Sequence, residues 1–382
     1  MRLPTERAHG IQIMNTCSGL AKQGASVHLY YSRRRQPDKT LGATNPFDFY
    51  NLEKSFSITA VPFLDVLIFE QLLGSFRKPF MILGGALFAL TSGFLAARSK
   101  PEIYISRHWL TAEWLVRRGK PTVFEIHQAG TDDFSDRAVR SLARLASRKS
   151  LMFVIAISQQ LKDELISAGA PPEKILVVPD AAVPINDADK LTPDAAKRKL
   201  GLKTDVLLAA YSGQMTEQKG AHVVVDAAIK TPGINYLMLG GPPESLQKMK
   251  ERSGNIPNIQ FHDSVRPKDV AIYQQAADIL LLPQVDKQAQ SPMKLYEYIE
   301  AKRPIIASDL PQIREVINNE TSGLLVSPSD PDSLAAAVRR LADDPDLRDN
   351  LANSASKRHQ TWNWDARAKA ILDRAADSLG GI

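Results

Sequence analysis

Between residues 206 and 342, short apolar runs alternate with segments of helical periodicity, and this alternation restricts the fold more than any other feature of the sequence. The runs span four to six residues and are apolar on both faces, which predicts parallel strands in a sheet covered by helices on both sides. The predicted strands are Val206–Tyr211, Tyr236–Gly240, Ile259–His262, Ile279–Pro283, Pro304–Ala307 and Gly323–Val326. The predicted helices are Ala221–Lys230, Ser245–Arg252, Pro267–Ala277, Pro292–Lys302, Pro311–Asn318 and Asp332–Ala342. We therefore expect an α/β, doubly wound, Rossmann-like domain that binds its ligand at the carboxyl ends of the strands.

The first half of the chain follows the same rhythm, with one departure at its beginning. A helix over Gly10–Gln23 precedes the strand Val27–Tyr31, so the strand that usually opens such a domain is missing. Either the start lies too far downstream or the domain does without that strand. Further on, we predict the strands Ile103–Ile105, Thr122–Ile126, Met152–Ile157 and Ile175–Val178 and the helix Gln159–Ala168. The segment Ala181–Leu191 is rich in Pro, Asp and Asn and reads as a linker, which gives an N-terminal domain over residues 1–184 and a C-terminal domain over residues 185–357.

An uncharged apolar run, Pro79–Ala97, lies between Lys78 and Arg98 and is just long enough to cross a bilayer. The strand that follows at Glu102–Ser106 would be split from the rest of its domain by a spanning helix. The run therefore favours a buried or interfacial helix over a membrane span, with peripheral contact to the inner leaflet as a further possibility.

The formal net charge of +6 and the pI of about 9.2 favour anionic partners, such as nucleotide phosphates or anionic lipid surfaces. Nucleic acid is not expected, because the sequence has no zinc-ligand spacing, basic helix or RNP-type aromatic strand. A single cysteine, Cys17, excludes an intramolecular disulfide framework and fits a reducing cytoplasm, and the N-terminus carries no signal peptide.

The strongest candidate site lies around residues 290–297, just after the predicted strand Ile279–Pro283. Ser291 is a suitable N-cap and Pro292 a suitable first residue for a helix, whose free amides and positive dipole end suit a pyrophosphate. Glu297 follows roughly 9 Å further along that helix, where its carboxylate could accept both hydroxyls of a ribose. The alternative is a helix whose glutamate is merely solvated.

Two further candidate sites also lie at the ends of predicted strands. After the strand Val206–Tyr211, Gly213 and Gly220 allow a tight turn, and Lys219 would stand at the N-terminus of the next helix as a charge for phosphate oxygens. His127 directly follows the strand Thr122–Ile126. Glu125 should lie on the same face of this segment as His127, because side chains alternate along a strand. Taken singly, a surface lysine or a structural histidine explains either motif equally well.

Taken together, these motifs resemble the family-4 retaining glycosyltransferases, which have the GT-B fold of two facing Rossmann-like domains. The resemblance covers almost the whole chain. It rests on five stretches of sequence. They are the opening segment Leu3–Ile13, the segment Phe124–His127, the turn from Gly213 to Gly220, the run Ala277–Pro283, and the stretch from Ser291 through Glu297 to Arg314 and Glu315.

The resemblance implies the role of each site residue. Catalysis would depend on three residues: His127 beside the transferred sugar, Lys219 at the leaving diphosphate and Glu297 at the donor ribose. The donor would further contact Gly10, Gly213, Gln214, Val265, Arg266, Ser291, Pro292, Met293 and Lys294. A C-terminal helix within residues 358–382 would cross back to the N-terminal domain. Two positions depart from the family pattern: Ala289 replaces the first glutamate of a pair, and Gln214 replaces an arginine. Lys294 could supply the missing positive charge.

The implied reaction is transfer of a hexose-type sugar from a nucleotide-sugar donor to a glycan or lipid-linked acceptor, with retention at the anomeric carbon. Catalysis would depend on positioning and on stabilising the leaving diphosphate, with closure of the two domains over the donor and no metal or other cofactor. Polysaccharide or glycolipid synthesis in the cytoplasm, with peripheral membrane contact, is the implied setting. A nucleotide-sugar 2-epimerase of similar fold and a non-catalytic nucleotide-binding subunit remain as alternatives, the second because of Ala289 and Gln214.

Overall fold

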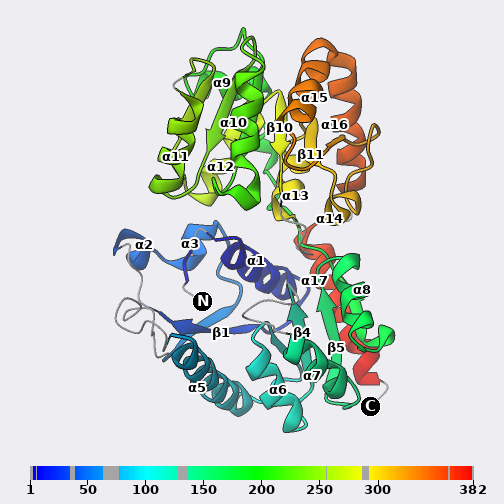
Figure 1. Ribbon diagram of the computed structural model, residues 1–382. Helices are drawn as coiled ribbons and strands as arrows, with labels where there is room; N and C mark the ends of the chain where they lie inside the picture. Colours follow the sequence, from blue (N-terminus) through cyan, green and yellow to red (C-terminus); the bar gives the residue numbers. More distant parts are fainter. Residues whose placement is uncertain are drawn as a thin grey trace. The chain divides into compact units, whose positions relative to one another are not determined.

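The computed structural model describes residues 3–5, 7–34, 39–62, 77–127, 136–254, 256–285, 292–359 and 362–380. The chain divides into two compact units (Figure 1). Unit 1 comprises Met1–Pro179 and Trp364–Ile382, and unit 2 comprises Asp180–Gln288 and Pro292–Asn363. Unit 1 therefore takes its residues from both ends of the chain.

Unit 2 is built on a six-stranded parallel sheet with the strand order β12-β11-β10-β7-β8-β9. The strands are β7 (Leu208–Ser212), β8 (Asn235–Leu239), β9 (Ile259–His262), β10 (Ile279–Leu282), β11 (Ile305–Ser308) and β12 (Leu324–Val326). Counted from the first strand of the unit, this is the order 6-5-4-1-2-3 of a doubly wound fold. The order reverses between β7 and β10, so the expected ligand crevice lies at the carboxyl ends of these two strands.

Helices cover both faces of this sheet, as the apolar character of the strands predicts. They are α9 (Pro193–Lys199), α10 (Ala221–Ile229), α11 (Pro243–Ser253), α12 (Pro267–Ala276), α13 (Met293–Glu300), α14 (Pro311–Arg314), α15 (Pro331–Asp343) and α16 (Pro345–His359). One core joins α10 and α15 to the sheet, and a second core joins α13 and α9 to its other face. Every residue of β10 is buried, so the prediction of a parallel sheet covered on both sides is confirmed.

Unit 1 contains a two-stranded parallel sheet, β1-β2, and a four-stranded parallel sheet, β3-β4-β5-β6. The strands are β1 (His28–Arg33), β2 (Ser57–Pro62), β3 (Tyr104–Ser106), β4 (Thr122–Ile126), β5 (Leu151–Ala156) and β6 (Ile175–Val177). The helices are α1 (Ala8–Lys22), α2 (Lys39–Ala43), α3 (Pro46–Tyr50), α5 (Arg77–Arg98), α6 (Trp109–Arg117), α7 (Asp136–Ala146), α8 (Gln159–Ser167) and α17 (Trp364–Gly380). Among the described residues no strand precedes α1, in agreement with the missing opening strand of the sequence.

The last helix of the chain, α17, belongs to the core of unit 1. Its residues Ala368, Ile371 and Ala375 are buried in one cluster with Leu20 of α1 and with Val123 and Phe153 of the central strands; the cluster members are Leu20, Val123, Met152, Phe153, Ile155, Val178, Ala368, Ile371 and Ala375. The C-terminal helix thus supplies part of the apolar surface that covers β4 and β5.

The apolar run Pro79–Ala97 lies within α5, which packs against α6 and β2. Only part of this helix is buried, because several of its large apolar side chains are exposed. In the part of the chain that the structure describes, no helix is both long and apolar enough to cross a membrane.

Several elements are missing from the sequence prediction or have different bounds, because short or polar segments show no clear periodicity. The helix α9 directly follows the predicted linker, and buried Lys197 fixes it to the sheet through an ion pair of 2.6 Å with Asp278 at the start of β10. The helix α14 is also shorter than predicted, ending at Arg314 instead of Asn318.

Candidate functional site

At the topological switch point of unit 2, a buried tyrosine connects the ends of the two flanking strands. The Tyr298 hydroxyl accepts a hydrogen bond of 3.0 Å from the backbone amide of Ser212, which ends β7. The same hydroxyl donates to the carbonyl of Leu281 in β10 at 3.2 Å. Tyr298 lies in α13, so these bonds fix α13 against the carboxyl edge of the sheet. Sequence reasoning did not single out Tyr298.

The turn after β7 passes close to the end of β10. Gly220 has a φ of +73°, and a Cβ atom at this position would lie 1.7 Å from the carbonyl oxygen of Pro283. Lys219 is half-buried and directly precedes Gly220, the N-cap of α10, so the lysine stands at a helix N-terminus, where sequence reasoning places it. The turn can approach β10 this closely only because residue 220 has no side chain.

We expect Gly220→Ala to lower the free energy of unfolding of unit 2 by about 2–3 kcal/mol, because alanine adds both left-handed backbone strain and a clash with Pro283. Hydrogen exchange of the β7 and β10 amides measures this loss locally. Gly233→Ala is the matched control, since a Cβ atom at Gly233 meets nothing within 4 Å. An unchanged exchange rate in Gly220→Ala would contradict the close approach.

The helix α13 begins one residue later than predicted. Pro292 takes the N-cap position with a ψ of 72°, and Met293 is the first helical residue. Pro292 is therefore not the first helical residue, and it makes no side-chain cap. Ser291 and Ala289 lie outside the described residues.

Glu297 accepts two hydrogen bonds on the same carboxylate oxygen. Lys294 Nζ donates to Oε2 at 2.6 Å, and Gln274 Nε2 of α12 donates to it at 3.0 Å. Gln274 Nε2 also lies 3.2 Å from Ser212 Oγ at the end of β7. Within the described part of the chain, Oε1 of Glu297 has no hydrogen-bond partner, so the carboxylate keeps acceptor capacity. Gln274, which sequence reasoning missed, orients Glu297 toward the edge where β7 ends.

Lys294 is the ion-pair partner of Glu297 in this site, with 27% of its side chain exposed. Burial alone would lower the pKa of Lys294, but the carboxylate of Glu297 and the hydroxyl of Tyr298 raise it above its usual value. Lys294 is therefore a cation beside Glu297. The hypothesis that it neutralises phosphate charge stays a prediction.

The remaining predicted donor contacts of unit 2 occupy two loops at the carboxyl edge of the sheet. Gly213 and Gln214 follow β7, and Gln214 is exposed while its carbonyl accepts a hydrogen bond of 2.6 Å from the Tyr211 hydroxyl. Val265 and Arg266 lie between β9 and α12, where Arg266 pairs with Asp269 at 2.9 Å. All four residues follow carboxyl ends of parallel strands, which is the edge where such folds bind ligands.

In unit 1, a buried carboxylate contacts the candidate catalytic histidine. Glu125 Oε1 lies 2.5 Å from His127 Nε2, which confirms that the two side chains share one face of the chain. Glu125 also accepts a hydrogen bond of 2.5 Å from Gln12 Nε2 in α1. Because an ionised carboxylate only accepts hydrogen bonds, Nε2 of His127 carries the proton.

The charge of Glu125 is held by an arginine from the last helix. Arg367 Nη2 of α17 lies 2.9 Å from Glu125 Oε1, and both side chains are 2% exposed. This contact is an ion pair without hydrogen-bond geometry, since Nη2 is also an unsatisfied buried donor. Burial alone would raise the pKa of Glu125, but Arg367 first, then His127 and Arg107, hold it well below its usual range. Arg367 Nη1 is fixed by the carbonyls of Val178 and Pro179, at 2.6 and 2.8 Å.

Gln12 and His9 of α1 complete the surroundings of this cluster. Arg107 Nη1 donates to Gln12 Oε1 at 2.7 Å, and burial together with the charge of Arg107 lowers the pKa of His9 to about 4. His9 is therefore neutral near pH 7. Gly10 lies within α1, and a Cβ atom there would lie 2.3 Å from the Tyr50 hydroxyl. The space at Gly10 is thus used for packing, and its predicted contact with the donor stays a prediction.

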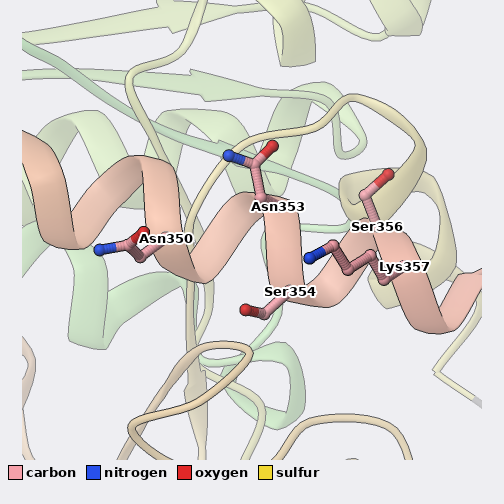
Figure 2. A pocket seen from close by; sticks show the side chains of 5 residues that line it. All are labelled: Asn350, Asn353, Ser354, Ser356 and Lys357. Atoms are coloured by element: carbon pink, nitrogen blue, oxygen red, sulfur yellow. The ribbon is translucent and has the colours of Figure 1, made fainter.

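A separate hollow lies on unit 2 and involves none of the predicted site residues. Its lining side chains are Asn350, Asn353, Ser354, Ser356 and Lys357, all from α16 (Figure 2). These five side chains form a polar surface on one helix. Lys357 is the one charged residue among them, and none of the five is buried. This hollow has no catalytic features.

Both units are α/β with parallel sheets, and His127, Lys219 and Glu297 all follow carboxyl ends of strands, an architecture shared with proteins of the GT-B class. Residues 193–358 match the family described as Glycosyl transferases group 1, and residues 10–182 match Glycosyltransferase Family 4. The chain belongs to the group 1 glycosyltransferases of the family 4 type.

Individual relatives agree with this family. A D-inositol 3-phosphate glycosyltransferase of Thermomonospora curvata is 25% identical over 329 residues, covering 76% of this chain and 76% of that relative. The fold is similar to that of Anabaena HepE in complex with UDP and glucose, with a TM-score of 0.72, 14% identity and coverage of 100% and 98% of the two chains. Sucrose-phosphate synthase of Thermosynechococcus elongatus gives a TM-score of 0.74 at 17% identity, with coverage of 98% and 94%.

Proposed function

We propose that this protein transfers a hexose-type sugar from a nucleotide-sugar donor to a glycan or lipid-linked acceptor, with retention at the anomeric carbon. The observation that carries the proposal is the arrangement in unit 2, where Lys219 and Glu297 follow the two strands that flank the switch point. A cation at a helix N-terminus suits a diphosphate, and a carboxylate with a free oxygen suits ribose hydroxyls. HepE, which shares the fold, was crystallised with UDP-glucose.

The cluster in unit 1 supports a role for His127 next to the transferred sugar. Glu125 accepts a hydrogen bond from Nε2 of His127 and so fixes the orientation of the ring. No protein nucleophile is required, because the proposed reaction depends on positioning and on stabilising the leaving diphosphate. We further propose that transfer takes place in the cytoplasm and needs no metal.

Nucleotide binding is tested by thermal-shift titration with UDP, GDP and ADP, and then with their sugars, because a ligand that binds only the folded state raises the melting temperature. We expect one base to be preferred and Glu297→Ala to weaken its binding by about 10- to 100-fold, the loss of a charged hydrogen bond. Glu244→Ala, at an exposed position of α11, is the control and should bind as the wild type does.

The other outcomes of this experiment are equally informative. If no nucleotide raises the melting temperature, the proposed transfer loses its support, and a non-catalytic subunit that binds nucleotide only weakly is favoured. If the sugar nucleotide is converted without an acceptor, it is an epimerase. In transfer assays with the preferred donor, the anomeric configuration of the product measured by NMR tests retention, and added chelator tests whether a metal is needed.

A further inference from the structure

The large exposed apolar side chains of the described residues are concentrated on one helix. Five of the eight such side chains lie on α5, and they are 41–67% exposed: Ile82, Leu83, Leu87, Leu90 and Phe94. The other three, Ile105, Val183 and Ile229, are scattered over other elements. Single exposed apolar residues are normal in proteins, whereas a contiguous group marks a surface for a partner.

The five side chains form one stripe, because Leu83, Leu87, Leu90 and Phe94 follow each other at intervals of three and four residues. From Ile82 to Phe94 the stripe is roughly 18 Å long. A different face of α5 is closed against α6, where a Cβ atom at Gly93 would lie 2.7 Å from the Trp114 ring. This close packing fixes the rotation of the helix, so the stripe cannot turn into the core of unit 1.

The stripe presents almost no free hydrogen-bonding groups. The Thr91 hydroxyl, the exposed polar group beside it, donates to the Leu87 carbonyl at 2.8 Å within the helix. Ser92 is buried and donates to the Phe88 carbonyl at 2.5 Å. Protein interfaces carry about one hydrogen bond per 100–200 Å², whereas acyl chains require none. This chemistry favours a lipid over a protein as the occupant.

The charges around α5 complement an anionic surface. The sequence holds no Asp or Glu from Arg77 to Pro101, and it has Arg77 and Lys78 at the start of the helix. At the other end, the Arg98 guanidinium lies 5.6 Å from the centre of the Phe94 ring. Exposed Lys100 follows directly. Apolar stripes with basic residues at their ends are typical of helices that lie in the headgroup region of a membrane.

We propose that the stripe Ile82, Leu83, Leu87, Leu90 and Phe94 of α5 docks unit 1 on an anionic lipid surface, with the helix axis parallel to the membrane plane. The apolar side chains enter the boundary between headgroups and acyl chains, and the basic residues Arg98 and Lys100 at the end of the helix contact lipid phosphates. This inference does not depend on the proposed transfer reaction, because the stripe contains none of the candidate catalytic or donor-binding residues.

The test uses the full-length protein in sedimentation with vesicles of phosphatidylcholine containing phosphatidylglycerol, and with vesicles of phosphatidylcholine alone. The test variant is Leu83→Gln/Leu87→Gln/Phe94→Gln. We expect the wild type to bind the anionic vesicles and the variant to bind them roughly 100-fold more weakly, since three apolar side chains no longer gain by leaving water. Binding of the wild type should weaken with added salt and on neutral vesicles.

The matched control is Ile105→Gln/Val183→Gln/Ile229→Gln, which removes the exposed apolar side chains outside α5 and should bind as the wild type does. Melting temperature and UDP binding are measured for both variants, and Leu87→Glu alone is a second test should the triple variant be unstable. Equal vesicle binding by wild type and test variants would overturn the proposal. So would a wild-type dimer that the α5 substitutions dissociate, since the stripe would then be covered by a second copy.

Discussion

Arg367→Met is expected to lower the free energy of unfolding of unit 1 by about 3–5 kcal/mol, because it leaves the Glu125 carboxylate buried without its cation. Both side chains are 2% exposed, so water cannot replace the lost partner. The substitution also removes the donors to the carbonyls of Val178 and Pro179. Hydrogen exchange of the β4 amides measures the loss within unit 1, where a single unfolding transition of the whole chain would not.

The loss should depend on pH in a defined direction. In the wild type the pKa of Glu125 is lowered, so its contribution to stability is present above the ordinary glutamate pKa of about 4.3 and is lost only below it. Without Arg367, we expect burial to outweigh the remaining effects of His127 and Arg107 and to raise the pKa of Glu125. The variant then regains free energy of unfolding as the pH falls through the raised pKa of Glu125, because the carboxyl group becomes neutral. The difference in melting temperature between wild type and variant should therefore be largest near pH 8 and narrow toward pH 5.

Two further variants show whether this effect comes from the charge. Lys369→Met removes an exposed cation of the same helix, one that pairs with Asp373, and should change stability by less than about 0.5 kcal/mol. Glu125→Gln/Arg367→Met removes both charges and should recover part of the loss, since no unpaired carboxylate remains. A double variant as unstable as Arg367→Met would place the effect in the backbone contacts instead.

Lys219→Ala is expected to reduce the rate of sugar transfer by about 10²–10³-fold, the usual cost of removing one group that stabilises developing charge. Its position, half-buried at the N-terminus of α10 and beside the end of β10, is where a leaving diphosphate would gain from a fixed cation. Turnover should fall more than substrate affinity does, because the charge on the diphosphate increases as the sugar leaves. Initial rates over a range of donor concentrations separate the two effects.

Lys248→Ala, at an exposed position of α11, is the control for the loss of one positive charge and should leave the rate unchanged. Lys219→Arg should restore part of the rate, since the charge is kept but its geometry differs. A Lys219→Ala variant with full turnover would remove this lysine from the reaction, whether or not Glu297 holds the nucleotide.

Unit 2 was predictable from the sequence because its strands are continuous apolar runs separated by amphipathic helices. The same reasoning was less complete for unit 1, where β2 and the short helices α2 and α3 lack a clear period. The polar helix α16 was also missed, because its sequence shows little apolar periodicity. The one-residue error at the start of α13 reflects the weak difference between proline as N-cap and proline as first helical residue.

For the candidate sites, the sequence indicated the residues at the ends of strands but not those that support them. Lys219 stands in a strand-to-helix turn, His127 directly follows β4, and Glu297 lies in the helix after β10, all positions that local patterns predict. Their supporting residues come from elsewhere: Gln274 reaches Glu297 from α12, and Arg367 reaches Glu125 from the last helix. Contacts between residues far apart in the chain leave no local pattern in a single sequence.

The position of α17 in the core of unit 1 has a consequence for the order of folding during synthesis. The ribosome completes β4 and β5 before it begins unit 2, but the helix that covers them and carries Arg367 emerges only after unit 2. Unit 2 lies wholly between the two parts of unit 1, so all of its strands leave the ribosome before unit 1 can close. Unit 1 is therefore begun before unit 2 and finished after it, and until then Glu125 has no cation from α17.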